Sequence, residues 1–106
     1  AKNVNVGIIR EFNYLVEQHF RTYTTVKEYA SMLSKSPKTL SNIFKKYIDQ
    51  SPLQIIQQRR LLEAKRLLLA NRKSIKEIAF DLNFSDIQTF SHFFKKQSGQ
   101  ATSEFK

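Results

Sequence analysis

Apolar residues recur along the chain at the three- and four-residue spacing of helices, in separate stretches divided by short polar segments. The predicted helices cover roughly residues 6–20, 26–33, 37–48, 52–70, 75–82 and 86–98, and the tail at 100–106 has room for one further helical turn. The chain has only two glycines and two prolines, which argues against a fold rich in β turns. The pattern therefore predicts an all-α protein of about seven helices.

Residues that favour helix N-termini stand at the start of most of these stretches. Thr25 and Ser74 each precede a glutamate, Glu28 and Glu77, by three residues, and this spacing is typical of a reciprocal capping box. A serine followed by a proline opens the third and fourth stretches, and Asp86 can cap the sixth. These helix starts are therefore supported by local signals as well as by apolar periodicity.

One face of each stretch carries the apolar side chains and is expected to be buried. The residues assigned to the core are Ile8, Phe12, Leu15, Val16, Val26, Tyr29, Ala30, Leu33, Leu40, Ile43, Phe44, Tyr47, Ile75, Ile78, Ala79, Leu82, Phe90, Phe93 and Phe94. His19 continues the apolar face of the first stretch. We therefore interpret His19 as a structural residue rather than a ligand-binding one.

Two segments of the chain match one another at a shift of about fifty residues. Residues 26–30 correspond to residues 75–79 at a shift of 49. Residues 40–46 correspond to residues 90–96 at a shift of 50, so one extra residue enters the intervening turn of the second copy. The chain therefore holds two copies of one helix pair, and the long fourth stretch connects them.

Each copy has the features of a helix-turn-helix. Ala30 and Ala79 lie in the middle of the first helix of each pair, where a small side chain lets a second helix cross closely at a steep angle. Both turns are short, and Asn83 tolerates the left-handed conformation that a tight turn often needs. We predict helix-turn-helix subdomains at 1–50 and 74–106, joined by a linker helix at 51–73. A helical repeat that serves only protein contacts stays open as an alternative.

The second copy carries a distinctive set of residues: Ile78-Ala79, Leu82-Asn83-Phe84, Asp86, Phe90-Ser91, Phe93-Phe94-Lys95-Lys96 and Gly99. The first copy and the connecting helix add Leu40-Ser41, Phe44-Lys45-Lys46, Ser51-Pro52, Arg60-Leu61, Glu63-Ala64 and Leu67-Leu68. Over residues 8 to 106, this combination resembles the AraC/XylS family of bacterial transcription regulators. Three positions depart from the family pattern: Asn83 replaces the usual glycine, Thr102 replaces the usual proline, and the closing aromatic-basic pair is Phe105-Lys106.

The resemblance implies a function as well as a fold. It implies sequence-specific binding of double-stranded promoter or operator DNA in the bacterial cytoplasm, with no cofactor and with RNA polymerase as protein partner. An effector-binding or dimerisation domain is expected before this chain, and the missing initiating methionine suggests an excised fragment. Because Thr102 removes a rigid helix start, the last helical turn is expected to be looser than in typical members.

The same resemblance implies that the helices at 37–48 and 86–97 enter successive segments of the major groove. Successive segments on one face of the duplex lie about 34 Å apart. The connecting helix would span about 28 Å at 1.5 Å per residue, which suits that separation. We therefore expect one monomer to contact one extended asymmetric site.

Outward-facing polar residues on these two helices are the candidates for base readout. They are Lys38, Thr39, Ser41, Asn42, Gln88, Thr89, Ser91 and His92. The amides of Asn42 and Gln88 suit adenine because each can donate and accept at once, whereas the ammonium of Lys38 suits guanine. For Lys38 a phosphate contact or plain solvation remains open, and His92 could equally be an ordinary surface histidine.

A second group of residues is expected to contact phosphates without reading sequence. These are Thr25 and Ser74 at helix starts, where backbone N–H groups favour anions, together with Lys45, Lys46, Arg60, Lys95 and Lys96. For the repeated lysine pairs, a solvated charge pair is the alternative.

The composition supports a polyanionic partner. The 106 residues include 18 Lys and Arg against 9 Asp and Glu, for a net charge of +9. Residues 51–73 alone sum to +5, whereas residues 74–106 sum to zero. We hypothesise that the first subdomain and the linker supply most of the affinity, and comparable losses from Asn42→Ala and His92→Ala would contradict this.

Other classes of protein fit the sequence less well. There is no cysteine, there are only two histidines, and no glycine loop could cradle a phosphate, so an enzyme or a metal site is not expected. No apolar run reaches the ~18 residues that a membrane span needs. A basic module on an anionic membrane would need exposed bulky apolar residues, but the phenylalanines fall at core positions of the repeat.

Overall fold

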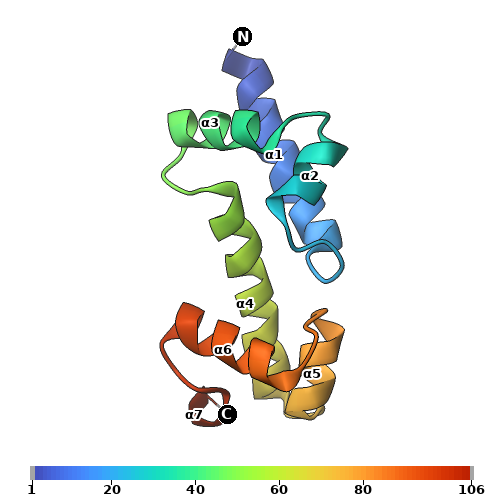
Figure 1. Ribbon diagram of the computed structural model, residues 1–106. Helices are drawn as coiled ribbons and strands as arrows, with labels where there is room; N and C mark the ends of the chain where they lie inside the picture. The colour runs from blue at the N-terminus through green and yellow to red at the C-terminus, as the bar shows by residue number, and fades with distance from the viewer. Residues whose placement is uncertain (1, 106) are drawn as a thin grey trace. The chain divides into compact units, whose positions relative to one another are not determined.

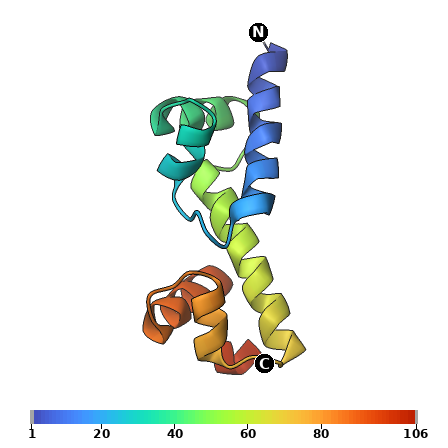
Figure 2. The same cartoon turned by 90° about the vertical axis from the view of Figure 1, so that its right-hand side faces the viewer.

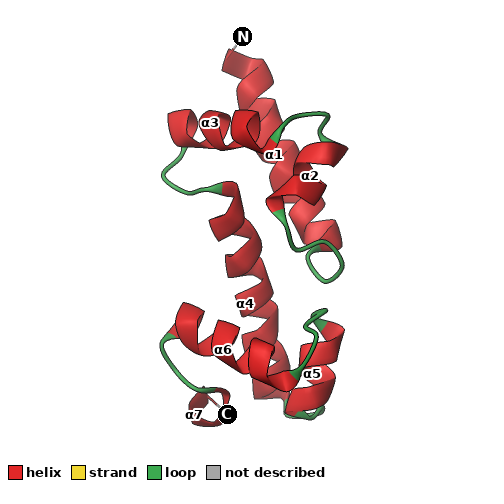
Figure 3. Cartoon of the chain, viewed as in Figure 1, coloured by secondary structure: helices red, strands yellow, loops and turns green. Residues whose placement is uncertain are grey.

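The computed structural model describes residues 2–105, and all its regular elements in that range are helices (Figure 3). In chain order they are α1 (Lys2–His19), α2 (Val26–Met32), α3 (Pro37–Tyr47), α4 (Pro52–Ala70), α5 (Ile75–Asp81), α6 (Ile87–Ser98) and α7 (Thr102–Phe105). The all-α prediction with about seven helices is therefore confirmed. Helix α1 begins earlier than residue 6, and Lys106 of the predicted closing pair lies outside the described residues.

The chain divides into two compact units, and the boundary between them along the chain falls within α4. The first unit ends at Gln57 and the second begins at Gln58, so α4 contributes its first turns to one and the rest to the other. A separate linker at 51–73 remains a prediction.

In the first unit, α2 and α3 lie beside α1 (Figures 1 and 2). The ring of Phe12 is fully buried and makes edge contacts with Tyr29 and Phe44, at centroid distances of 5.5 and 4.9 Å. The buried face of α1 follows residues 9, 12, 16 and 20, so Ile9 occupies the core and Ile8 is only half-buried, unlike the prediction. The core therefore forms around three aromatic rings.

In the second unit, α5 and α6 pack beside the C-terminal half of α4 (Figures 1 and 2). The buried apolar residues of this unit are Ala64, Leu68, Ile78, Ala79, Leu82, Phe90 and Phe94. Asn83 adopts the expected left-handed conformation in the α5–α6 turn, with φ of 66°, and α6 ends at Gly99 with φ of 81°. Ser34 makes the corresponding turn of the first unit with φ of 56°.

The final helical turn is held in place despite the lack of proline at Thr102. Glu104 Oε1 accepts a hydrogen bond from the N–H of Ala101, the residue directly before this turn, at 2.9 Å. The Phe105 ring makes an edge contact with Phe94, at a centroid distance of 5.5 Å. These two contacts hold the final turn, and its expected looseness relative to typical members stays a prediction.

Candidate nucleic-acid interface

The outer face of α3 is polar and accessible. Lys38, Thr39, Ser41 and Asn42 are all exposed, whereas Leu40 and Phe44 on the opposite face are fully buried. The buried pair fixes the rotation of the helix about its axis, because turning it would expose both side chains to water. The face predicted to read bases is therefore the face that the structure leaves free.

The same arrangement recurs on α6. Gln88, Thr89 and His92 are exposed and Ser91 is half-buried, while Phe90 and Phe94 are fully buried. Phe93, predicted as a core residue, is half-buried and contacts Phe84 at a centroid distance of 5.2 Å. The predicted base-reading residues of both copies thus lie on matching faces of matching helices.

The starts of α3 and α6 are capped by different groups. Ser36 Oγ accepts from the Thr39 N–H at 3.1 Å and donates to Thr39 Oγ1 at 2.9 Å. At α6 a carboxylate oxygen of Asp86 accepts from the Thr89 N–H at 2.7 Å, and this bond lowers the pKa of Asp86. The carboxylate cap of α6 would repel a phosphate at this helix start, whereas the neutral serine cap of α3 would not.

Both predicted capping boxes are present. Thr25 Oγ1 accepts from the Glu28 N–H, and Glu28 Oε1 accepts from the Thr25 N–H at 3.1 Å. Ser74 and Glu77 repeat the arrangement, and the bonds from Ser74 lower the pKa of Glu77. Since a charged glutamate already occupies each helix start, Thr25 and Ser74 are poorer phosphate sites than the sequence suggests.

The paired lysines are better placed to meet phosphates. Lys45 and Lys46 lie in the last turn of α3, Lys95 and Lys96 lie in the last turn of α6, and all four are exposed. Cations in a last helical turn also interact favourably with the helix dipole. Each base-reading candidate face therefore has a pair of ammonium groups at its C-terminal end.

Arg60 does not fit the phosphate contact predicted for it. Only 7% of the residue is exposed, and its Nη2 donates to the backbone carbonyl of Leu82 at 2.6 Å. The guanidinium also lies 4.3 Å from the centroid of the Phe84 ring. We therefore correct the prediction: Arg60 is part of the interior of the second unit.

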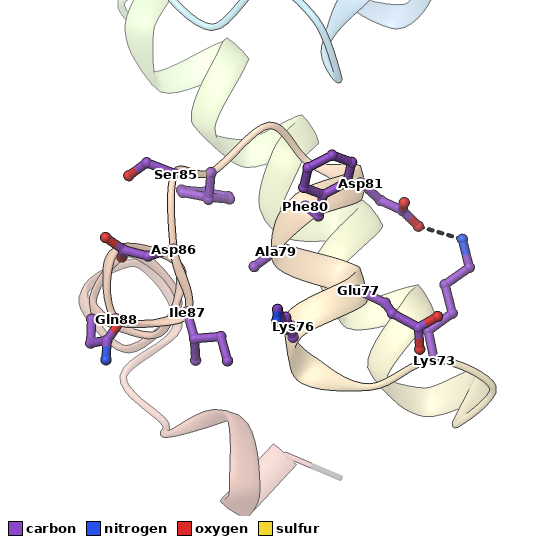
Figure 4. Close-up of a pocket in the computed structure, with 11 residues that line it drawn as sticks. Lys73, Lys76, Glu77, Ala79, Phe80, Asp81, Ser85, Asp86, Ile87 and Gln88 are labelled. Atoms are coloured by element: carbon purple, nitrogen blue, oxygen red, sulfur yellow. Dashed lines mark hydrogen bonds and ion pairs between the residues drawn. The ribbon is translucent and has the colours of Figure 1, made fainter.

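A groove of about 600 Å³ lies between α5 and the start of α6 (Figure 4). Its apolar lining includes Phe80, which is 81% exposed, and Ile87. Gln88 lies along the groove, and an ion pair between Lys73 and Asp81 stands at its side. The prediction that the phenylalanines fall at core positions is therefore wrong for Phe80, which lies on the side of α5 opposite the buried Ile78 and Ala79.

Two other kinds of site are not found in the described part of the chain. None of its helices combines the length and the apolar character needed to cross a bilayer. Residues 2–105 also hold no group of three or more His, Asp or Glu side chains placed to bind a metal ion.

Comparison with known families and structures gives consistent matches. A family model described as a helix-turn-helix domain matches residues 29–106. The raffinose operon transcriptional regulatory protein of Pediococcus pentosaceus is 29% identical across the whole chain, and the arabinose operon regulatory protein of Salmonella typhimurium is 31% identical over 89% of it. The chain spans only 39% and 32% of the lengths of these two relatives.

A solved structure supports the same grouping. The C-terminal domain of AraT, a response regulator from Geobacillus stearothermophilus, is 28% identical to this chain and superimposes with a TM-score of 0.84. The match covers 92% of this chain and 82% of that domain. The likeness therefore extends over both helix-turn-helix units.

Proposed function

Because this chain is a DNA-binding domain of the AraC family of helix-turn-helix transcription regulators, we propose that α3 and α6 are its two recognition helices. The proposal rests on one observation: both copies present exposed polar residues on a helix whose opposite face is locked by buried aromatic side chains. The base-reading residues are Lys38, Thr39, Ser41, Asn42, Gln88, Thr89, Ser91 and His92. The lysines at positions 45, 46, 95 and 96 contact phosphates on either side of the groove.

Replacing Asn42 or Gln88 with alanine tests the assignment of the two helices. Each amide can make a bidentate contact with one base, so we expect each replacement to cost about 1 to 3 kcal/mol of binding free energy on the preferred sequence. Selection of random duplex DNA, repeated with each variant, would measure this. The selected site should contain two blocks of preferred bases, one for each recognition helix. Asn42→Ala should relax base preference in one block, and Gln88→Ala should relax it in the other.

Asn13→Ala is a suitable control, because Asn13 carries the same amide on an exposed position of α1 and lies on neither α3 nor α6. It should leave both blocks intact. Relaxation of the same block by Asn42→Ala and Gln88→Ala would contradict the assignment of one helix to each block. Absence of any enriched sequence for the unchanged chain would contradict sequence-specific binding altogether.

The whole protein is proposed to act in the bacterial cytoplasm. It is also proposed to carry a sensor or dimerisation domain before this region, because the chain spans only part of the length of its relatives. No independent catalysis is proposed for this region. RNA polymerase is the proposed protein partner, and the exposed Phe80 supports a protein contact, since bulky apolar side chains in grooves are typical of protein interfaces.

Phe80→Ser tests that partner. We expect DNA affinity within about twofold of the original, because Phe80 lies on α5 and has no group that can hydrogen-bond a base or a phosphate. Transcription in vitro should be at least about fivefold lower, as expected for loss of one aromatic anchor that the polymerase would bury. The measurement is run-off transcription by purified polymerase at saturating protein, from a promoter that carries the selected site. Unchanged transcription would exclude Phe80 from the polymerase contact.

A further inference from the structure

The buried guanidinium of Arg60 joins three parts of the second unit. The side chain comes from α4, and its Nη2 donates to the carbonyl of Leu82, the C-cap residue of α5, at 2.6 Å. The guanidinium carbon lies 4.3 Å from the ring centroid of Phe84 in the turn and 5.4 Å from that of Phe93 on α6. One charged group therefore contacts the end of α5, the turn and the recognition helix.

These contacts suit the local electrostatics. The last carbonyls of a helix have no partner within the helix and carry partial negative charge, so a cation beside them is favourable. The faces of aromatic rings are also negative, and Arg can stack on a ring while its edge donates a hydrogen bond. The chain turns sharply directly after Leu82, where Asn83 takes a φ of 66°. Arg60 thus binds the carbonyl directly before Asn83, the residue at which the chain changes direction between α5 and α6.

The first unit places a different side chain at the corresponding position. Aligning α1 with α4 at a shift of 48 pairs Phe12 with Arg60, and it pairs Val16 with the buried Ala64. Phe12 makes ring contacts with Tyr29 and Phe44, and its side chain has no group that can donate or accept a hydrogen bond. Ring contacts tolerate small rotations, whereas a hydrogen bond to a single carbonyl has a preferred direction.

We propose that Arg60 is a positioning residue: its hydrogen bond to Leu82 and its stacking on Phe84 and Phe93 set the orientation of α6 against α5, and thereby the base preference of the second unit alone. The inference rests on the proposed reading of DNA by α6. Arg60 acts through the turn and touches no DNA, so its replacement should change which bases are preferred without removing a phosphate contact.

The test compares Arg60→Met, Arg60→Lys and the original chain in the same duplex selection. We expect discrimination in the block relaxed by Gln88→Ala to fall by roughly tenfold, the scale of one bidentate base contact, with the other block unchanged. Arg60→Lys should behave like Arg60→Met, because an ammonium keeps the charge but lacks the planar fork. Arg72→Met is the matched control. It also replaces an arginine with methionine, but at an exposed position, and should leave the base preference of both blocks unchanged.

The salt dependence of binding separates positioning from a phosphate contact. A positioning residue leaves the slope of log K against log salt unchanged, whereas loss of a phosphate contact lowers its magnitude by about one. A lower slope with uniform loss across sequences would overturn the inference. So would unchanged preference in both blocks, or full rescue by Arg60→Lys.

Backbone amide NMR shifts of the DNA-free protein provide a readout that does not depend on DNA reading. Arg60→Lys should move the signals of residues 82–93 while those of the first unit stay in place, and the dispersion of the spectrum would show that the variant is folded. Unmoved signals at 82–93 would overturn the positioning role. If these signals move but the original chain selects no sequence, the positioning role stands and the proposed function fails.

Discussion

Replacing Phe12 with alanine is expected to lower the free energy of unfolding of the first unit by about 3 to 5 kcal/mol, through lost apolar burial and the cavity left behind. The ring is fully buried and touches both Tyr29 and Phe44, so the loss reaches α1, α2 and α3. A small domain has only about 5 to 15 kcal/mol of stability in total. Urea unfolding followed by circular dichroism, with NMR to locate the loss, would measure the change.

Tyr14→Ala provides the matched control, because this aromatic residue lies on the same helix two positions later and is 63% exposed. Its replacement should change the free energy of unfolding by no more than about 0.5 kcal/mol. A cost below about 1 kcal/mol for Phe12→Ala would mean that the three-ring core is not the centre of the first unit.

Replacing Lys45, Lys46, Lys95 and Lys96 together with alanine is expected to weaken DNA binding by about a thousandfold at moderate salt, since four charge contacts to the polyanion are lost. Each phosphate contact contributes about one to the slope of log K against log salt, so the magnitude of the slope should fall by about four. The order of preference among sequences should stay the same, because phosphates carry no base identity. Fluorescence anisotropy titrations over a range of salt concentrations would measure both effects.

Three simpler variants serve as controls for the expected loss of affinity. Arg10→Ala removes an exposed charge from α1 and should change the slope by less than about 0.5, as expected for a charge without a phosphate partner. The two lysine pairs can also be removed one at a time. If the Lys95 and Lys96 pair alone accounts for the whole effect, the hypothesis that the first unit and the linker supply most of the affinity is wrong.

Much of the fold could be predicted from the sequence because its signals are local. The capping boxes at Thr25 and Ser74, the left-handed turn at Asn83 and the helix end at Gly99 each depend on residues within one turn of one another. The choice between Ile8 and Ile9 for the core was wrong because adjacent apolar residues both fit a helical stripe. Only packing against other helices decides between them.

For the candidate interface, the sequence predicted the exposed residues of α3 and α6 but not the buried arginine. Exposure of Asn42 and Gln88 follows from the same periodicity that buries their neighbours, so the exposed faces of α3 and α6 could be predicted, and their reading of bases stays a proposal. The interior place of Arg60 could not, because an arginine in a charged segment normally points to water and its partners Leu82 and Phe84 lie more than twenty residues away. The exposure of Phe80 was missed for a different reason: the phenylalanines were all assigned to core positions, although the helical period places residue 80 opposite the buried Ile78 and Ala79.

The boundary between the two units inside α4 has a consequence for how the chain is made. Contacts within each unit join residues that are close in sequence, and domains of this kind fold in microseconds to milliseconds. Ribosomes add only about 5 to 20 residues per second. Ile56, the last fully buried apolar residue of the first unit, precedes the first residue of α5 by 19 positions, so it leaves the ribosome about 1 to 4 seconds earlier. The first unit can therefore complete its core before the second unit has emerged, which keeps the two similar repeats from pairing wrongly.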